Sequence, residues 1–470
     1  MGAPAAGLFT STRVAHPPTH PSRLAAHAVL LGLEPANADG ARILEIGCGS
    51  GANLLPMAAA MPSARLLGID TSERDIRAGR AALEDLGLRN LDLRHATLTD
   101  VAWNDVSDGT GFDYVIADGV YSNLASADRG LFAQRIASLL SPHGVAFVSY
   151  RCYPGAYAGQ ALREACLLHA GFLEDVEQRA EESQSLLRLL ACQPEASWLR
   201  PECGRLLALS TAEFGREELG EHTSASYFFQ FARHALQHGL QFLAESSFGG
   251  SSLFGLPRDA AERLEGLIAD NPLAVEQYLD LLRMRRVRET LLCRADVFVD
   301  RQARLGRVEA LWAASSARRI DRLPQDPDNS TAYALADGSR LAVVDSRLCA
   351  TLDTLAGSWP HPVRIRNIDC DRKALLDLHG AGFVDLQAWA PSIFGLSDRP
   401  SVPQWIRWQA AQGCDLTNAY HCAVRIDDSF TRSLLSLLDG TRDSNALERA
   451  LGRPVGDALR EVAQFALLGG

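Results

Sequence analysis

Apolar residues follow two alternating spacings over the first 150 residues of the chain. Short apolar runs predict strands at 41–47, 64–70, 91–96, 112–118 and 144–150. Apolar residues at helical spacing lie between and before these runs and predict helices over 22–33, 53–61, 73–87 and 129–140. Strands that alternate with helices indicate a parallel, doubly wound sheet, and such sheets bind ligands at the carboxyl ends of their strands.

The pattern changes after residue 158. Apolar residues recur at helical spacing over most of 159–300, which predicts an almost wholly helical region. Beyond about residue 304, the stretches TAYAL and RLAVV flank the turn sequence Ala336–Asp337–Gly338–Ser339, which predicts a β-hairpin. Helices at 346–356 and 371–379 and a strand at 382–389 follow. This hairpin with its short helices predicts a small winged-helix-like domain.

The composition limits the class of protein. The chain has 470 residues, 47% apolar and 22% charged, which is an ordinary composition for a globular protein of two to four domains. Its net charge of −11 argues against a general nucleic-acid binder, because phosphate binding requires a basic surface. The ten cysteines are scattered without a CxxC pair, the N-terminus lacks the basic start and apolar core of a signal peptide, and no apolar run is long enough to span a membrane. These features predict a soluble cytoplasmic protein with reduced thiols and no metal.

A glycine-rich turn follows the first predicted strand. In the sequence Glu45–Ile46–Gly47–Cys48–Gly49–Ser50–Gly51, the glycines let the backbone pass close to a bound ligand without a Cβ clash. Gly47, Gly49 and Ala52 also fit a dinucleotide fingerprint, whereas a Walker loop is excluded because no Lys-Ser/Thr pair follows. A turn that binds no ligand is the remaining alternative.

Two acidic residues favour S-adenosylmethionine over NAD at this turn. Glu45 lies two residues before the first glycine, where a carboxylate would face the cationic end of S-adenosylmethionine and repel a pyrophosphate. Asp70 ends the second strand, where its carboxylate can bind both ribose hydroxyls. Thr97 follows the third strand, can accept a hydrogen bond from the adenine amine and has a carboxylate, Asp100, nearby. The predicted cofactor-binding residues are Glu45, Gly47, Gly49, Gly51, Asn53, Asp70, Thr71, Thr97 and Asp118.

The end of the fourth strand predicts the place where methyl group and acceptor meet. The spacing of Asp118 and Tyr121 resembles the D/N-P-P-F/Y element of amino-group methyltransferases. An amine nucleophile needs hydrogen-bond acceptors that aim its lone pair, and an aromatic ring can flank the developing positive charge. Tyr150 and Tyr153 frame a Pro-Gly turn after the fifth strand and could line an acceptor channel. The alternative is that Asp118 caps its loop and the three tyrosines pack in the core or rim.

The chain resembles the bacterial class I methyltransferases that carry a methyltransferase regulatory domain, whose best-understood members methylate lysines of rickettsial outer-membrane proteins. The resemblance follows the stretches 19–26, 41–59, 112–124, 144–157, 228–246, 276–293, 417–428 and 437–443. Gly47, Gly49, Gly51 and Asp70 match the cofactor motifs of the family, Tyr121 and Ser122 its Gly-Val-Tyr-Ser element, and Tyr150, Pro154 and Gly155 its element after the fifth strand. The family usually has His at the position of Asp118, Trp at that of Asn123, Asn at that of Arg151 and Trp at that of Ala156. All four departures fall on the acceptor side.

The resemblance implies an organisation and a function. We expect an α/β fold with a Rossmann-like, seven-stranded class I methyltransferase domain at 1–160, a helical connecting or dimerisation segment at 161–215, a helical regulatory domain at 216–304 and a winged-helix-like α+β domain at 305–470. The expected reaction is methyl transfer from S-adenosylmethionine to lysine amines of a protein or peptide, with a homodimer and no nucleic-acid or membrane partner. The alternatives are a small-molecule or natural-product-peptide acceptor, and a cofactor-binding or partner-binding scaffold without catalysis.

Overall fold

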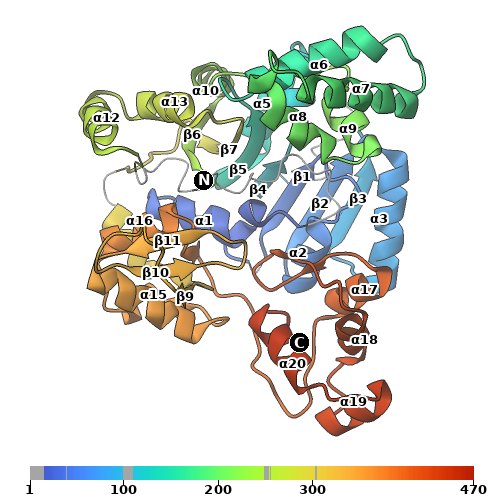
Figure 1. Cartoon of the computed structure of the whole chain (residues 1–470), viewed down its shortest axis with the longest axis vertical. Coiled ribbons are helices and arrows are strands. Elements are labelled where there is room, and N and C mark those ends of the chain that lie inside the picture. Colours follow the sequence, from blue (N-terminus) through green and yellow to red (C-terminus); the bar gives the residue numbers. More distant parts are fainter. Residues whose placement is uncertain are drawn as a thin grey trace.

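A seven-stranded sheet organises the first three hundred residues, with the strand order β3-β2-β1-β4-β5-β7-β6 (Figure 1). The computed structural model describes residues 15–38, 40–98, 109–247, 253, 256–301 and 304–469. The five predicted strands are confirmed as β1 (Arg42–Ile46), β2 (Arg65–Asp70), β3 (Leu91–His95), β4 (Phe112–Ala117) and β5 (Leu140–Arg151), and all neighbours among them pair in parallel. The carboxyl ends of β1 to β4 therefore share one edge, as the sequence predicts.

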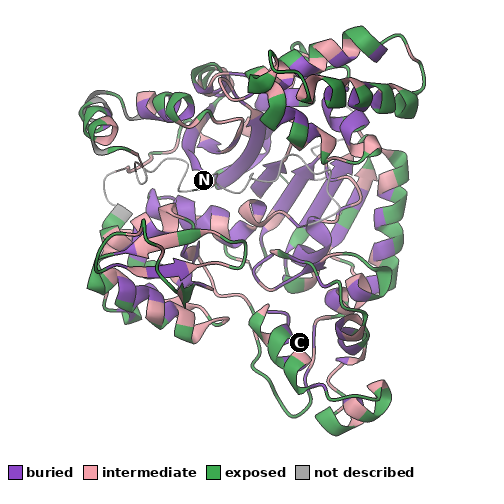
Figure 2. Cartoon of the chain, viewed as in Figure 1, coloured by how far each residue is buried: buried purple, intermediate pink, exposed green. Residues whose placement is uncertain are grey.

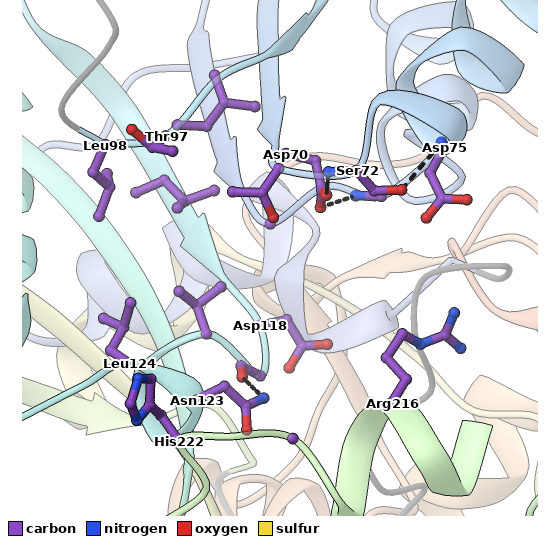
Figure 3. Close-up of a pocket in the computed structure, with 18 of the residues that line it drawn as sticks. Asp70, Ser72, Asp75, Thr97, Leu98, Asp118, Asn123, Leu124, Arg216 and His222 are labelled. Carbon is purple, nitrogen blue, oxygen red and sulfur yellow. Dashed lines mark hydrogen bonds between the residues drawn. The ribbon is translucent and has the colours of Figure 1, made fainter. Parts of the chain in front are cut away.

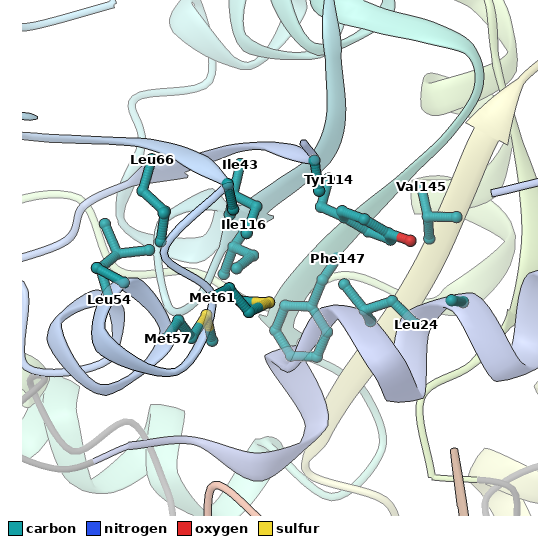
Figure 4. Packing of buried hydrophobic residues seen from close by; sticks show 14 of the residues in the cluster. Leu24, Ile43, Leu54, Met57, Met61, Leu66, Tyr114, Ile116, Val145 and Phe147 are labelled. Carbon is teal, nitrogen blue, oxygen red and sulfur yellow. The ribbon is translucent and has the colours of Figure 1, made fainter. Parts of the chain in front are cut away.

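Two layers of helices cover the sheet. One face packs against α1 (Pro21–Leu30), α2 (Leu54–Ala60) and α3 (Glu73–Leu86) through the core in Figure 4, where Leu24, Met57 and Phe147 meet. The other face packs against α5 (Asp128–Leu139) and α10 (Phe228–Gln237). Both faces are buried, as Figure 2 shows, because successive residues of each strand point to opposite layers.

The helical prediction for 159–300 is confirmed for most of its length. The helices in this stretch are α6 (Tyr157–Ala170), α7 (Val176–Ala191), α8 (Arg200–Leu207), α9 (Thr211–Glu218), α10, α12 (Arg258–Asp270) and α13 (Pro272–Arg283). The prediction is wrong at β6 (Leu240–Glu245) and β7 (Val287–Arg294), where the chain returns to the sheet. β7 pairs antiparallel with both β5 and β6, so the predicted helical regulatory region supplies the last two strands of the sheet.

The residues after 304 build two units, each around a core of its own that also contacts neighbouring parts of the chain. The first contains α14 (Arg304–Arg307), β8 (Trp312–Ala314), β9 (Arg318–Ile320), β10 (Thr331–Ala334), β11 (Arg340–Val343), α15 (Ser346–Ser358), β12 (Val363–Arg364), α16 (Arg372–Gly380) and β13 (Asp385–Gln387). The predicted hairpin is confirmed as β10 and β11. The second contains α17 (Gln404–Gln412), β14 (Leu416–Thr417), β15 (Ala423–Val424), α18 (Ser429–Leu437), α19 (Ser444–Leu451) and α20 (Gly456–Gln464). Among the described residues, no helix is long and apolar enough to cross a membrane.

Candidate cofactor site

A cavity of about 890 Å³ opens at the shared edge where β1 to β4 end (Figure 3). Its volume lies within the range of small-molecule sites. Each strand contributes predicted cofactor-binding residues to its lining, and these are Gly47, Gly49, Asp70, Thr71, Thr97 and Asp118. Asp100, the carboxylate expected near Thr97, lies outside the described residues. The structure therefore brings together residues that are up to 71 positions apart in the chain.

Asp70 ties the glycine turn to the end of β2. Its Oδ2 accepts a hydrogen bond from the backbone N–H of Gly49 at 2.8 Å, and its Oδ1 accepts one from Ser72 at 2.7 Å. Gly47 has a φ of 76°, and a Cβ there would lie 2.7 Å from Cγ2 of Val120. Glycine is therefore required at this position both by its conformation and by the close approach of the loop after β4. Asp70 remains exposed to the cavity, where its carboxylate can also accept ribose hydroxyls.

Glu45 lies behind the glycine turn and not in the cavity lining. Its side chain is 1% exposed, and its Oε1 accepts a hydrogen bond from Asn53 Nδ2 at 3.1 Å. Its Oε2 has no hydrogen-bond partner among the described residues. Burial raises the pKa of Glu45 to about 8, and the charges of Asp118 and Asp70 add to this rise, whereas the hydrogen bond from Asn53 opposes it. A half-satisfied buried carboxyl group beside the cavity suits a cationic ligand, as S-adenosylmethionine is.

Asn53 and Gly51 also lie outside the described lining of the cavity. Asn53 is 1% exposed and occupies the position before α2, so it contacts Glu45 and not the space where a ligand would bind. Gly51 has a φ of 73° and completes the turn. In the structure both residues support the glycine loop, and a direct contact of either with the cofactor stays a prediction.

Asp118 is held in a fixed orientation at the end of β4. Its Oδ1 accepts a hydrogen bond from Ser149 Oγ at 2.5 Å, and that hydroxyl accepts one from the backbone N–H of Gly119 at 2.6 Å. Asn123, one of the departures from the family pattern, lines the same part of the cavity and donates from Nδ2 to the carbonyl of Gly119 at 2.8 Å. Both side chains are accessible to a ligand and are immobilised by neighbouring groups.

The three predicted tyrosines do not belong to the described lining of the cavity. Tyr150 is 0% exposed and stacks on Phe231 with ring centroids 4.0 Å apart, so it is a core residue. Tyr121 is 4% exposed, packs edge-on against Phe231 and lies 3.3 Å from His234 Nδ1 through its hydroxyl. The rings of Tyr121 and Tyr150 thus pack under α10, as in the alternative that they are core residues, and their roles beside the acceptor stay predictions. Tyr153 is half-buried and stacks on Tyr157 at 4.2 Å.

Part of the cavity wall comes from residues that the sequence did not predict. The segment at and after the end of α9 contributes Arg216, Glu217, Gly220, Glu221 and His222, and α3 and α5 contribute Arg74, Asp75 and Asp128. No local motif marks the residues at and after α9, since they reach the cavity only through the packing of this segment near the carboxyl ends of the strands. The described lining contains six carboxylate side chains and two guanidinium groups, so the cavity favours cations.

Three family models match consecutive parts of the chain. They are described as "Methyltransferase domain" for residues 37–200, "Predicted methyltransferase regulatory domain" for 215–294 and "PKMT, C-terminal winged helix domain" for 398–462. The last match confirms a winged helix in the C-terminal unit. The β10–β11 hairpin, on which the prediction rested, belongs to the unit before it.

Relatives and solved structures extend these matches along the chain. The uncharacterized protein RP789 of Rickettsia prowazekii is 26% identical over 92% of this chain and 83% of its own length. The uncharacterized protein RP028 of the same organism is 31% identical over 48% of this chain and 91% of its own length. The structure of PKMT2 from Rickettsia typhi superposes with a TM-score of 0.83 at 22% identity, covering 97% of this chain and 99% of that one. The same protein in complex with AdoHcy gives a TM-score of 0.82. The chain belongs to the class I S-adenosylmethionine-dependent methyltransferases that carry a regulatory domain and a C-terminal winged helix.

Proposed function

We propose that this methyltransferase acts on lysine amines of a protein or peptide. The observation that carries the proposal is the excess of carboxylates around the cavity, which attracts a cationic side chain as well as a cationic cofactor. S-adenosylmethionine supplies the methyl group when it is bound. The match to a winged-helix model named for PKMT, and the fold shared with PKMT2 of Rickettsia typhi, support a protein acceptor.

Asp118 is proposed to orient the acceptor amine. A lysine ammonium, with a pKa of about 10.4 in water, must lose a proton before its nitrogen can attack. The Asp118 carboxylate, fixed through Ser149, can accept hydrogen bonds from that nitrogen and favour one direction of its lone pair. Methyl transfer is an in-line displacement, so this orientation is the main contribution that the chain can make.

A small-molecule or natural-product-peptide acceptor is the second candidate. It is favoured by Asp118 and Asn123, the two departures from the family pattern that line the cavity. A protein acceptor and a small acceptor differ in the size of the labelled product, which makes the two candidates separable.

A tritium-transfer assay tests the acceptor class. The enzyme and methyl-labelled S-adenosylmethionine are incubated with a lysate of the host organism, the products are separated by size, and labelled protein is hydrolysed for amino-acid analysis. We expect label in a protein band that is recovered as methyl-lysine. Label confined to small molecules would instead establish the second candidate, and label in another amino acid would contradict the lysine proposal.

The role of Asp118 is tested by the variant Asp118→Asn on the labelled acceptor. This change keeps the side-chain shape and removes the charge, so we expect kcat to fall on the order of 100-fold. The dissociation constant of S-adenosylmethionine should change far less, which calorimetry measures. An equal loss in both quantities would place Asp118 in cofactor binding alone.

The cytoplasmic location and the homodimer remain predictions. We propose that the dimer forms through the helical segment 161–215, because Leu168, Phe172 and Val176 are large apolar side chains that are more than half exposed near the turn between α6 and α7. Sedimentation analysis of the wild type and of Phe172→Glu tests this contact.

A further inference from the structure

A hairpin of the C-terminal winged helix reaches the residues behind the glycine turn. β14 and β15 pair antiparallel, and the turn between them, residues 418–422, carries His421 at its tip. His421 is 3% exposed, and its Nε2 lies 2.8 Å from Oδ1 of Asn53, which is 368 positions away in the chain. In Figure 1 the neighbouring helix α17 lies beside α2 and α3, so this part of the unit packs against the helices on one side of the sheet.

The hydrogen bonds around Asn53 fix the direction of its side-chain amide. The backbone N–H of His16 can only donate, and it lies 2.9 Å from Oδ1, so this atom is the amide oxygen. The Nδ2 group then donates to Glu45 Oε1 at 3.1 Å and to Thr19 Oγ1 at 3.0 Å. His421 must therefore donate to Asn53, and Asn53 to Glu45, in one continuous chain of hydrogen bonds.

The tip of the hairpin is held from several sides. Oδ1 of Asn418 accepts hydrogen bonds from the backbone N–H groups of Tyr420 and Cys422 at 3.0 and 2.9 Å. Tyr420 stacks on Trp359 at 4.9 Å, and its hydroxyl donates to the carbonyl of Pro360 at 2.7 Å. His421 itself has a φ of 57°, which is uncommon for a residue other than glycine and persists only where the surroundings hold it. The imidazole is thus presented to Asn53 in one orientation.

The protonation of His421 agrees with this arrangement. Burial lowers the pKa of His421 well below its usual value, and the charge of Arg23 and the neighbouring rings of His20 and His16 add to this effect. Glu45, which carries the orphaned Oε2, faces it across Asn53. The ring is therefore neutral, with one donor nitrogen, and Nε2 is that donor.

We infer that His421 is a positioning residue of the cofactor site: through Asn53 it orients the Glu45 carboxylate toward the cationic end of S-adenosylmethionine. The winged helix is then a structural part of the cofactor site, 368 residues from the turn that it supports. Coupling of this kind is reciprocal, so a partner that displaces the hairpin weakens cofactor binding and bound cofactor holds the hairpin in place.

Two substitutions at position 421 test the inference on the full-length protein. His421→Leu keeps the bulk of the side chain and removes the donor, and we expect the dissociation constant of S-adenosylmethionine to rise about fivefold to tenfold, as for one lost hydrogen bond. His421→Gln restores a donor near the position of Nε2, so its dissociation constant should stay within about twofold of the wild type. Calorimetric titration measures all three proteins.

Tyr420→Phe is the matched control in the same turn. It removes the hydrogen bond to Pro360 but touches neither Asn53 nor Glu45, so it should lower the melting temperature and leave the dissociation constant unchanged. The inference is overturned if His421→Leu binds S-adenosylmethionine like the wild type, or if His421→Gln is as impaired as His421→Leu. An equal loss of affinity in Tyr420→Phe would show that only the docking of the unit matters, and would overturn it as well.

Discussion

Glu45 gives cofactor binding a pH dependence. Its carboxyl group, with a pKa of about 8 in the free protein, is mostly neutral at pH 6 and must ionise to attract a cation. Asp70 and Asp118, which line the cavity, raise this pKa, so a cation in the same cavity must lower it. We therefore expect S-adenosylmethionine to bind more tightly as the pH rises from 6 to 8, with release of a proton. Calorimetry in buffers of different ionisation enthalpy measures both effects.

The variant Glu45→Gln is the control for this prediction, and it should bind S-adenosylmethionine weakly, with little change in affinity between pH 6 and 8. A wild-type affinity for S-adenosylmethionine that does not change from pH 6 to 8 would contradict the role of Glu45.

The raised pKa of Glu45 also affects the stability of the free protein. In the unfolded chain this carboxyl group ionises near pH 4.5, so between about 4.5 and 8 the unfolded state binds fewer protons than the folded one. This group therefore lowers the free energy of unfolding as the pH rises through that interval.

Asp70 should be the most sensitive single residue for cofactor affinity. Asp70→Ala removes the acceptor of the N–H groups of Gly49 and Ser72 together with the proposed contact to the ribose, so we expect affinity to fall on the order of 100-fold. Asp70→Asn keeps one acceptor oxygen and should lose about tenfold. Calorimetry compares both with the wild type. If Asp70→Ala binds S-adenosylmethionine normally, the residue serves only the fold of the turn.

The sequence predicts this site unevenly, and the reason is local. Asp70 ends a strand and Gly47 and Asp118 directly follow one, so the shared edge of a parallel sheet brings them together whatever the rest of the fold does. Tyr150 ends a strand that is apolar on both faces, and such a strand does not reveal which layer a side chain enters. His222 reaches the cavity only through tertiary packing, which no short motif encodes.

The helix α3 supports the glycine turn at Gly79, where its backbone lies close to Ser50 and to the side chain of Leu93. A methyl group on Gly79 would overlap the carbonyl oxygen of Ser50, so Gly79→Ala should push the turn, weaken S-adenosylmethionine binding severalfold and cost about 1–3 kcal/mol of stability. Gly87→Ala is the control at the end of the same helix. Its φ of 63° strains alanine by about 1 kcal/mol, but no atom lies within 4 Å of the new methyl group. Denaturant titration and calorimetry should show lower stability in both variants and lower affinity only in Gly79→Ala; equal affinity in both would contradict the support of the turn by α3.

The strands β6 and β7 are hard to predict because each follows an amphipathic helix after only two or three residues. Gly239 lies between α10 and β6 with a φ of 85°, and this glycine was the one signal that separated the two elements. Met284 ends α13 with a φ of 49°, a conformation that its residue type does not announce. The helical period of the preceding apolar residues therefore carried the prediction across both boundaries.

The units of the molecule share their cores. Ala26 and Leu30 of α1 pack into the core of the unit around residues 308–386, while Leu24 and Ala28 of the same helix pack under the sheet. Trp405 and Trp408 of the winged helix lie against the sheet core from its other end, and β6 and β7 complete the sheet itself. The boundaries predicted at 160 and 215 fall inside α6 and α9, and the sheet itself takes strands from both sides of them.

Shared cores predict that the chain unfolds in one transition. Leu352→Ala removes a fully buried side chain from the 308–386 unit at a cost of about 2–5 kcal/mol. Because α1 belongs to both cores, we expect this variant to lower the melting temperature of the whole molecule by a few degrees, with far-UV circular dichroism and tryptophan fluorescence changing together. S-adenosylhomocysteine at 100 times its dissociation constant should raise that single midpoint by about 3 °C. A separate early transition in Leu352→Ala, insensitive to S-adenosylhomocysteine, would show instead that the unit unfolds alone and that the contact through α1 does not couple it to the cofactor site.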